Sequence, residues 1–578
     1  MRIKAVHVAG LAAALMGGVA KDALADTTVS NSTTTPLLTS SAGNITLDSN
    51  GKITVTAGQT AITVDSNNNV ANGGSIGSTA ADNTTGILLG NGASGTISNT
   101  SIITLAEPSP LSDTDGDGDL DGPWATGSNR FGILLNAGST FTGDVTSSGS
   151  ITVSGNSSAG ISLNGLLDGN LTTTGSVNIV GDNSVGVLVG GGATAGITGD
   201  VLLRGNMSIS GQNSSAIVVD APVGGQLRVN GTIVSNGYHS TVQPSDTSHL
   251  DADDLEQSAA TLAIHSNVAG GVTLEGIGVE DDPDDDGDGV TEAEGDTNDD
   301  LTSSLTSYGG APAILIQADP GNSMTLGPNS NGFGLQVRGN ITASGVYDGV
   351  ESRAISILGN GAATTAIQGG VALDFSVTDA ASEADAYGLY IGANASTPEV
   401  LQRKAFTVTS VSEGAHNAYG VFFDTNASVP SFTNSGTMLA QVFGETGNAT
   451  AITDRSNTLA TITNYGTLQA RVVATDTDPT DSTPPPPVTG SSTAIDVSTS
   501  TIGVTFNQIP DVPFTDDDSV DDDVGLRPTI QTVGDIKFGS GADAVNLLAG
   551  TIAGDISFGA GADAMTVDNG STFTGRIS

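Results

Sequence analysis

Two aspartate-rich segments carry oxygen ligands at a spacing that suits calcium. In the first segment, Asp113, Asp115 and Asp117 alternate with other residues, Gly118 follows them, and Asp121 stands at the ninth position of the loop. Carboxylate oxygens at this spacing converge on one Ca²⁺ ion, and the glycine permits the sharp bend that the loop needs. The first segment therefore matches the first half of a D-x-D-x-D-G calcium loop.

The second segment repeats this pattern. The candidate ligands that it adds are Asp284, Asp286, Asp288 and Glu292. An EF-hand has a glutamate at the twelfth loop position and a helix on either side. Here Trp124 and Gly295 stand at the twelfth positions, and the sequence predicts no flanking helix. Two interpretations of both segments therefore stay open: isolated Ca²⁺ loops, or acidic loops that are simply solvated.

Other patterns for catalysis are weak. Residues 73–77 read G-x-S-x-G and residues 90–95 read G-x-G-x-x-G, but turn and strand residues follow both. A nucleophile elbow or a dinucleotide-binding loop needs a helix at that point. The sequence has no H-x-x-x-H pair for zinc, and its carboxylates are too numerous for one glycosidase-like pair to stand out. We therefore expect a protein that is not an enzyme.

The charge balance narrows the range of partners. The 578-residue chain has 16 Lys and Arg against 62 Asp and Glu, a formal net charge of −46. So large a negative charge repels phosphate groups, which excludes sequence-independent binding of nucleic acid and attraction to anionic lipid. The chain has no cysteine, which excludes disulfides, a thiolate nucleophile and cysteine-ligated metal.

The N-terminus has the pattern of a signal peptide. Arg2 and Lys4 form a short basic region, an apolar run covers residues 5–20, and residues 23–25 read Ala-Leu-Ala, a small-residue cleavage pattern. We expect residues 1–25 to be removed on export. No later segment reaches the roughly 20 apolar residues of a membrane-spanning helix.

One phrase repeats along most of the chain. Each copy has a Gly/Asn/Ser turn, then a small residue, then apolar residues in alternation. The clearest copies begin at Gly127, Gly155, Gly181 and Gly211, which are 28, 26 and 30 residues apart. Other short alternating segments bounded by glycine, such as GSITVSG from Gly149, lie between the copies. Repetition at such a period is typical of solenoid architectures.

Three short strands and three turns in each repeat make one coil of a parallel β-solenoid, so the predicted fold class is all-β. Alternation places Ile, Val and Leu inside the coil and Thr, Ser and Asn outside. One coil cannot bury its apolar face alone, so neighbouring coils must stack, and we expect about 18 of them. A string of β-sandwich domains is the alternative, but such domains do not repeat one phrase at this spacing.

Acidic or proline-rich segments interrupt the repeat, and we interpret them as loop insertions at the corners of coils. The predicted organisation is a signal peptide at 1–25, a β-solenoid at 26–475 with acidic insertions near 107–124, 238–256 and 279–300, a proline-rich acidic linker at 476–489, and C-terminal solenoid coils at 490–578. These last coils contain a 20-residue repeat that begins at Gly534 and again at Gly554.

The export signal, the Gly/Ser/Thr/Asn-rich coils and the closing run G-D-I-x-F-G-x-G-A-D-A together resemble the passenger region of autotransporter (type V secretion) proteins of Gram-negative bacteria. The resemblance implies a right-handed parallel β-helix, exported through the periplasm and held at the cell surface by a C-terminal β-barrel in the outer membrane. A few more coils and that barrel are then expected to follow residue 578.

The resemblance also implies a function. It favours a secreted or surface-displayed, non-enzymatic passenger that acts in adhesion or another cell-surface interaction. The expected partners are a cell-surface protein or glycan, or another copy of the chain, and Ca²⁺ at the two aspartate loops is the cofactor to test. The alternative is a β-helical enzyme that acts on surface polysaccharide, which requires carboxylates together with Arg or Lys on one exposed sheet face.

Overall fold

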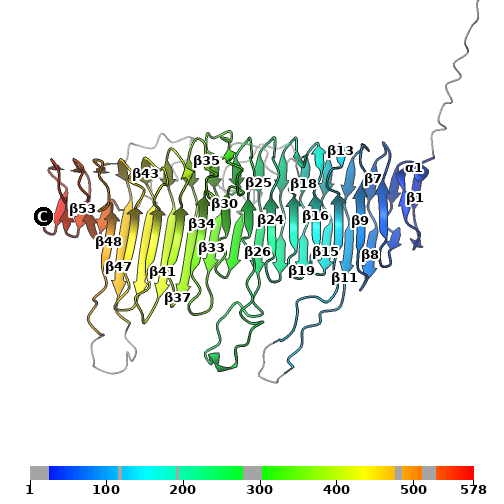
Figure 1. Cartoon of the computed structure of the whole chain (residues 1–578), viewed down its shortest axis with the longest axis horizontal. Helices are drawn as coiled ribbons and strands as arrows, with labels where there is room; N and C mark the ends of the chain where they lie inside the picture. Colours follow the sequence, from blue (N-terminus) through cyan, green and yellow to red (C-terminus); the bar gives the residue numbers. More distant parts are fainter. Residues whose placement is uncertain (1–24, 115–119, 191–193, 277–302, 476–484, 511–528) are drawn as a thin grey trace, which may run out of the picture.

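In the computed structural model, the chain winds into an elongated stack of coils made of short strands and tight turns (Figure 1). The structure describes residues 25–114, 120–190, 194–276, 303–475, 485–510 and 529–578. Equivalent strands of successive coils pair in parallel, as β14 (Val145–Ser147) pairs with β18 (Leu171–Thr173). The predicted fold class, an all-β parallel β-solenoid, is confirmed. The predicted signal peptide, apart from Ala25, lies outside the described residues.

Three long parallel sheets run along the stack. Sheet A has 17 strands, close to the number of coils expected, from β1 (Thr27–Val29) to β55 (Ala564–Val567). Sheet B runs from β2 (Ser32–Thr33) to β56 (Thr572–Thr574). Short ladders between sheets C and A consist of β13 (Thr140–Thr142), β17 (Leu166–Asp168) and β21 (Gly196–Ile197), and of β31 (Met324–Leu326), β35 (Thr365–Ile367) and β39 (Ala395–Ser396).

Sheet C has 16 strands and carries the surfaces discussed below. They are β3 (Leu37–Leu38), β6 (Thr60–Val64), β9 (Thr84–Leu89), β12 (Arg130–Leu135), β16 (Ala159–Leu163), β20 (Val185–Val189), β24 (Ser215–Val219), β27 (Leu262–Ile264), β30 (Ile314–Gln317), β34 (Ser352–Leu358), β38 (Ala386–Ile391), β42 (Ala418–Phe423), β45 (Ala449–Asp454), β48 (Ser492–Asp496), β51 (Asp535–Lys537) and β54 (Ile556–Ser557).

Helical structure in the described residues is limited to the single turn α1 (Thr39–Ala42) and the 3₁₀ turn η1 (Thr247–His249). Neither of these, nor any other described segment, forms a helix long and apolar enough to cross a membrane.

The repeated phrase of the sequence forms the strands of sheet C. Its four clearest copies end in β12, β16, β20 and β24. The small residue in the phrase has a steric cause, because a Cβ on Gly132 would lie 2.7 Å from Cγ2 of Ile151 and 2.5 Å from the carbonyl oxygen of Gly160. The inward side chain of Ile151, on sheet B, therefore occupies the space that a larger residue would need.

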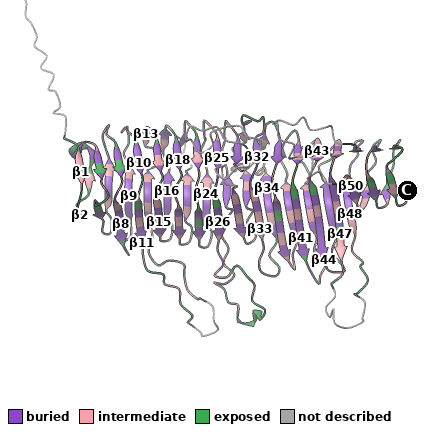
Figure 2. Ribbon diagram, turned by 180° about the vertical axis from the view of Figure 1, so that it is seen from behind, coloured by how far each residue is buried: buried purple, intermediate pink, exposed green. Residues whose placement is uncertain are grey.

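The inward side chains of the three sheets form one continuous apolar core. Buried positions recur on strands along the whole length of the stack (Figure 2). Some of the polar residues in this core stack on one another: the Nδ2 of Asn72 donates to Oδ1 of Asn99 at 2.7 Å, and the Nδ2 of Asn434 donates to Oδ1 of Asn464 at 2.8 Å. All four side chains are buried. A buried amide is tolerated where its neighbour in the next coil accepts its hydrogen bond.

The polar residues at the corners join successive coils. The Oδ1 of Asp144 accepts the backbone N–H of Asn170, the Oδ1 of Asn170 accepts that of Asp200, and the Oδ1 of Asp200 accepts that of Gln226, each at 2.8 Å. Asp535 accepts the N–H of Asp555 in the C-terminal coils in the same way, at 2.9 Å. The recurrent Asp and Asn of the repeat are therefore hydrogen-bonding residues of the stack.

The acidic insertions leave the stack at two different corners. The segments that follow β11 (Ile102–Ala106), β26 (Thr232–Asn236) and β47 (Thr467–Val473) connect sheet B to sheet C, and they project from the same edge of the molecule in Figure 1. The segment between β28 (Val272–Leu274) and β29 (Ser304–Tyr308) instead connects sheet A to sheet B. The two aspartate loops of the sequence therefore belong to different corners.

Candidate functional site

The candidate calcium ligands lie only partly within the described residues. Asp113 and Asp121 are described, whereas Asp115, Asp117 and all of Asp284, Asp286, Asp288 and Glu292 lie outside the described residues. The Oδ2 of Asp121 accepts the hydroxyl of Thr114 at 2.6 Å, and the backbones of Ser112 and Asp121 exchange two hydrogen bonds. Across the described part of the chain, no group of three His, Asp or Glu side chains is placed to hold a metal ion.

Calcium binding at these loops stays a prediction with a direct test. If the loops bind Ca²⁺, millimolar calcium should raise the melting temperature of the mature chain, because a ligand that binds only the folded state stabilises it by mass action. Magnesium at the same ionic strength should raise it less, since Mg²⁺ takes fewer protein ligands. Equal responses to both ions, or none to calcium or chelator, would identify solvated acidic loops.

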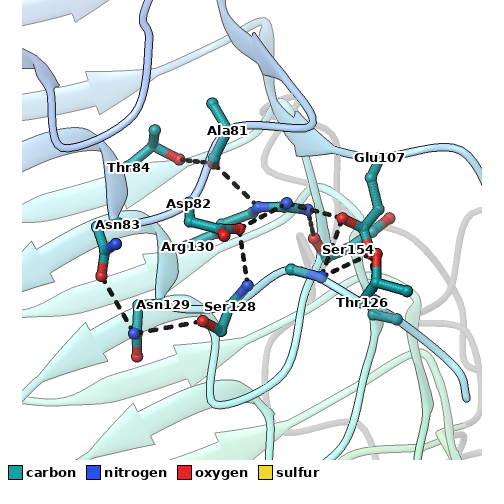
Figure 3. Close-up of polar contacts among 12 residues, drawn as sticks. Ala81, Asp82, Asn83, Thr84, Glu107, Thr126, Ser128, Asn129, Arg130 and Ser154 are labelled. Atoms are coloured by element: carbon teal, nitrogen blue, oxygen red, sulfur yellow. Dashed lines mark hydrogen bonds and ion pairs between the residues drawn. The ribbon is translucent and has the colours of Figure 1, made fainter.

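The base of the first insertion is held by a buried arginine (Figure 3). The side chain of Arg130 is 1% exposed, and its Nη2 lies 2.8 Å from Oε2 of Glu107 and 3.0 Å from Oδ1 of Asp82. Its guanidinium also donates to the carbonyl oxygens of Ala81 and Ser154. Because Arg130 begins β12 and Glu107 directly follows β11, this ion pair closes the two ends of the insertion.

Glu107 is also held by backbone donors. Its Oε1 accepts the N–H of Thr126 at 2.6 Å and that of Gly127 at 3.0 Å. Burial acts to raise the pKa of Glu107, but the hydrogen bonds from Gly127, Arg130 and Thr126 outweigh it and lower the pKa to about 2. The carboxylate is therefore charged over the physiological range, and the network is structural.

The first two insertions pack against each other. The indole Nε1 of Trp124 donates to the carbonyl oxygen of Gly237 at 3.1 Å, and the Trp124 ring meets the ring of His239 edge-on at 4.9 Å. The N–H of Gly122 donates to Oδ2 of Asp253 at 2.7 Å. Trp124 of the first insertion thus contacts the second insertion, which lies more than 100 residues further along the sequence.

An aromatic patch lies on the outer face of sheet C. We define it as Tyr387 and Tyr390 on β38 and Tyr419 and Phe422 on β42, together with Arg353 on β34. Tyr387 stacks on Tyr419 with ring centroids 4.9 Å apart, and Tyr390 stacks on Phe422 at 5.5 Å. The in-register pairing of β38 with β42 places these rings over one another.

Arg353 covers one end of the aromatic patch. Its guanidinium carbon lies 4.3 Å from the ring centroid of Tyr390 and 5.0 Å from that of Tyr387, within the range of cation–π attraction. Its Nε also lies 2.7 Å from Oε1 of Glu351. All five residues of the patch are partly exposed to solvent. The patch therefore presents stacked aromatic rings and one positively charged guanidinium group at the protein surface.

Acidic side chains border the aromatic patch. The hydroxyl of Tyr390 donates to Asp424, and Asp496 pairs with Arg455 at 2.6 Å. Burial raises the pKa of the Tyr390 hydroxyl to about 12 and also raises that of Tyr419, so both phenols stay protonated and can donate hydrogen bonds. Binding hot spots are enriched in tyrosine, tryptophan and arginine. The patch therefore has a composition that suits binding.

The sequence contained a signal for this patch that the prediction missed. The segments A-Y-G-L-Y-I from Ala386 and A-Y-G-V-F-F from Ala418 are copies of the coil phrase in which aromatic residues fill both outward positions. Aromatic residues make up only 4% of the chain. Two neighbouring copies with aromatics at the same outward positions therefore predict a cluster, once the copies are placed side by side on one sheet.

Arginines and carboxylates also meet beside the outer face of sheet A. Glu275, whose side chain is 5% exposed, lies 3.1 Å from Nε of Arg204 and also pairs with Arg228. Asp374 lies 2.8 Å from Nη1 of Arg403. This is the kind of arrangement that a polysaccharide-degrading β-helix requires, although both carboxylates are engaged in ion pairs.

No protein-family model matches the chain, and no curated protein or solved structure shows significant similarity to it.

Proposed function

We propose that the chain is a secreted or surface-displayed passenger of the autotransporter type that is not an enzyme and acts in adhesion or another cell-surface interaction. The aromatic patch of sheet C carries this proposal. The resemblance of the coils to autotransporter passengers adds the expected location: export through the periplasm and attachment at the outer membrane.

The stiffness of the patch favours binding. Its four rings are stacked in two pairs on adjacent strands of a 16-stranded sheet, and Arg353 is held over two of them. Side chains that are already ordered lose little conformational entropy when a partner docks. The rim of phenols and carboxylates offers both donors and acceptors, which suits a cell-surface protein or a glycan.

Replacement of Tyr387 and Tyr390 by threonine tests this function. Threonine keeps the strand propensity but removes the rings, so binding of the labelled mature chain to bacterial or animal cells should fall about tenfold or more. Tyr308→Thr, which removes a partly exposed tyrosine at the end of β29 on sheet B, is the matched control and should bind as the wild type does.

The same assay identifies the class of partner. Trypsin treatment of the cells removes a protein partner, and mild periodate oxidation removes a glycan. The proposal of adhesion through this patch is wrong if the Tyr387→Thr, Tyr390→Thr variant binds as well as the Tyr308→Thr control. It is also wrong if the wild type binds neither cell type at micromolar concentration.

The second candidate function is a polysaccharide-degrading enzyme, which the arginine–carboxylate group of Arg204, Arg228 and Glu275 favours. The side chain of Glu275 is only 5% exposed and is already paired with two guanidinium groups, so it has little surface to offer a substrate. Adhesion through the aromatic patch is therefore the better supported proposal. Release of new reducing ends from bacterial surface polysaccharide would favour the enzyme.

A further inference from the structure

The outer face of sheet C is apolar along its N-terminal half. We define the aliphatic row as the partly exposed side chains Leu88, Leu134, Leu188, Val218 and Leu315. Strand pairing places them in one line along the stack, with Ser162 between Leu134 and Leu188. Ala263 stands between Val218 and Leu315 in the same line. From β9 to β30, five of the seven positions in this line are therefore aliphatic and partly exposed, and the other two, Ser162 and Ala263, are small and buried.

The corresponding line on sheet A is largely polar. Its middle positions in the same part of the stack are Ser98, Thr146, Thr172, Leu202, Arg228 and Thr273. An all-polar exterior would satisfy the alternation of a solenoid strand equally well. Exposed apolar patches mark interaction sites, so the repeated outward leucines of sheet C indicate a surface that a partner covers.

A second line of outward residues lies beside the aliphatic row and contains Phe131, Val185 and small residues. From β6 to β30, the outward positions of these described strands carry no charged side chain. The 62 acidic residues of the chain lie elsewhere, and many of them are in the corner insertions. The strands of this face are therefore uncharged on a molecule with a net charge of −46, and the nearest carboxylates, such as Asp65 and Asp220, stand just beyond the strand ends.

We propose that two copies of the chain associate through this face, with the aliphatic row of one copy packed on the row of the other. A second copy is the fitting occupant because an interface between identical copies uses the same patch on both, and a line of similar aliphatic residues can pack on itself under a two-fold rotation. An uncharged face also lets two strongly acidic molecules meet without opposing like charges at the contact.

The size of the face suits a dimer. Eight strands of sheet C, from β6 to β30, take part. At about 4.8 Å between strands and about 17 Å along a five-residue strand, this gives about 650 Å² on each copy. The total of about 1,300 Å² falls in the range of stable protein–protein interfaces, roughly 1,200 to 2,000 Å².

Sedimentation velocity of the mature chain tests the proposal. The wild type should form dimers at micromolar concentration in 150 mM NaCl, and higher salt should strengthen the dimer, because salt screens the repulsion between the two acidic molecules. Replacement of Leu134 and Leu188 by lysine should weaken it about 100-fold or more, since four charges would be buried in an apolar contact. Association that weakens with salt would contradict a contact between uncharged faces.

The matched control is Thr146→Lys with Thr172→Lys, which adds the same charge to the outer face of sheet A in the same part of the stack. Its dissociation constant should stay within about threefold of the wild type. If the lysine pair on sheet C prevents folding, Leu134→Thr with Leu188→Thr should fold and still weaken the dimer about tenfold. The proposal is wrong if the wild type is monomeric at 100 µM, or if the sheet C variants dimerise like the control.

This association is independent of adhesion through the aromatic patch. The Tyr387→Thr, Tyr390→Thr variant should dimerise as the wild type does, because its substitutions lie outside the strands from β6 to β30. Failure of cell binding with normal dimers would therefore count against the proposed function alone.

Discussion

Replacement of Arg130 by methionine is expected to destabilise the chain by about 3–5 kcal/mol, because it leaves a buried carboxylate without its partner. Glu107 has a side chain that is 6% exposed, and it loses the guanidinium that lies 2.8 Å away. The carbonyl oxygens of Ala81 and Ser154 lose their donor as well. Thermal melting and urea denaturation of the mature chain measure the loss, and limited proteolysis should show earlier cleavage in the first insertion.

A surface ion pair of the same type provides the control. Arg576 pairs with Asp555 at 2.8 Å, but its side chain is 88% exposed, so Arg576→Met should change stability by less than about 1 kcal/mol. Similar losses for both variants would show that the buried network does not hold the base of the insertion.

The network also predicts a pH dependence. Because the pKa of Glu107 is lowered to about 2 in the folded chain from its ordinary value of 4.5, its contribution to stability is complete above pH 4.5. That contribution is lost as the pH falls from 4.5 towards 2. The stability difference between wild type and Glu107→Gln should therefore shrink over this interval.

Asp379→Asn is expected to stabilise the chain at pH 7, by an amount on the order of a few kcal/mol. Asp379 lies on β37 (Val377–Ser382) of sheet B, faces the core and is fully buried. Its Oδ1 accepts the hydroxyl of Ser352, but its Oδ2 has no hydrogen-bond partner among the described residues. Burial raises the pKa of Asp379 to about 8 from 3.8, so the folded chain holds a proton that the unfolded chain releases.

The sign of this effect follows from the proton balance. Between pH 3.8 and 8 the unfolded state binds fewer protons than the folded state, so wild-type stability should fall by about 1.4 kcal/mol for each pH unit. Asparagine, which has the same shape and does not ionise, removes this loss. Melting temperatures from pH 4 to 9 should decline for the wild type relative to Asp379→Asn.

Exposed Asp168→Asn is the control for this series and should change stability by less than about 0.5 kcal/mol at every pH. Parallel pH profiles for the wild type and Asp379→Asn would mean that Asp379 ionises normally in the folded chain.

The periodicity of the sequence was sufficient to predict the coils. The phrase copies from Gly127 to Gly211 became equivalent strands of one sheet because inward residues such as Ile133 and Ile161 must align between coils to be buried. The small residue in each copy was visible as a pattern. Its cause, the inward side chain of Ile151 against Gly132, was not visible, because it depends on how sheet B faces sheet C.

The surface features were harder to predict because they join residues from distant coils. Tyr387 and Tyr419 are 32 residues apart in the sequence but stack at 4.9 Å, since β38 and β42 are paired in register. The contact of Trp124 with His239 depends on two insertions that leave the stack at the same corner. The prediction treated each insertion as a separate loop.

The sequence by itself determined the all-β class, the stacking of coils and the acidic character of the insertions, because alternation, turn residues and charge act over a few neighbouring residues. Only the tertiary structure decided which outward residues share a face, and so formed the aromatic patch from Tyr387 to Phe422 and the aliphatic row from Leu88 to Leu315. It also paired Arg130 with Glu107, 23 residues away. The physical reason is that coil length and inter-strand register set these contacts, and both are fixed only when the coils stack and bury the core.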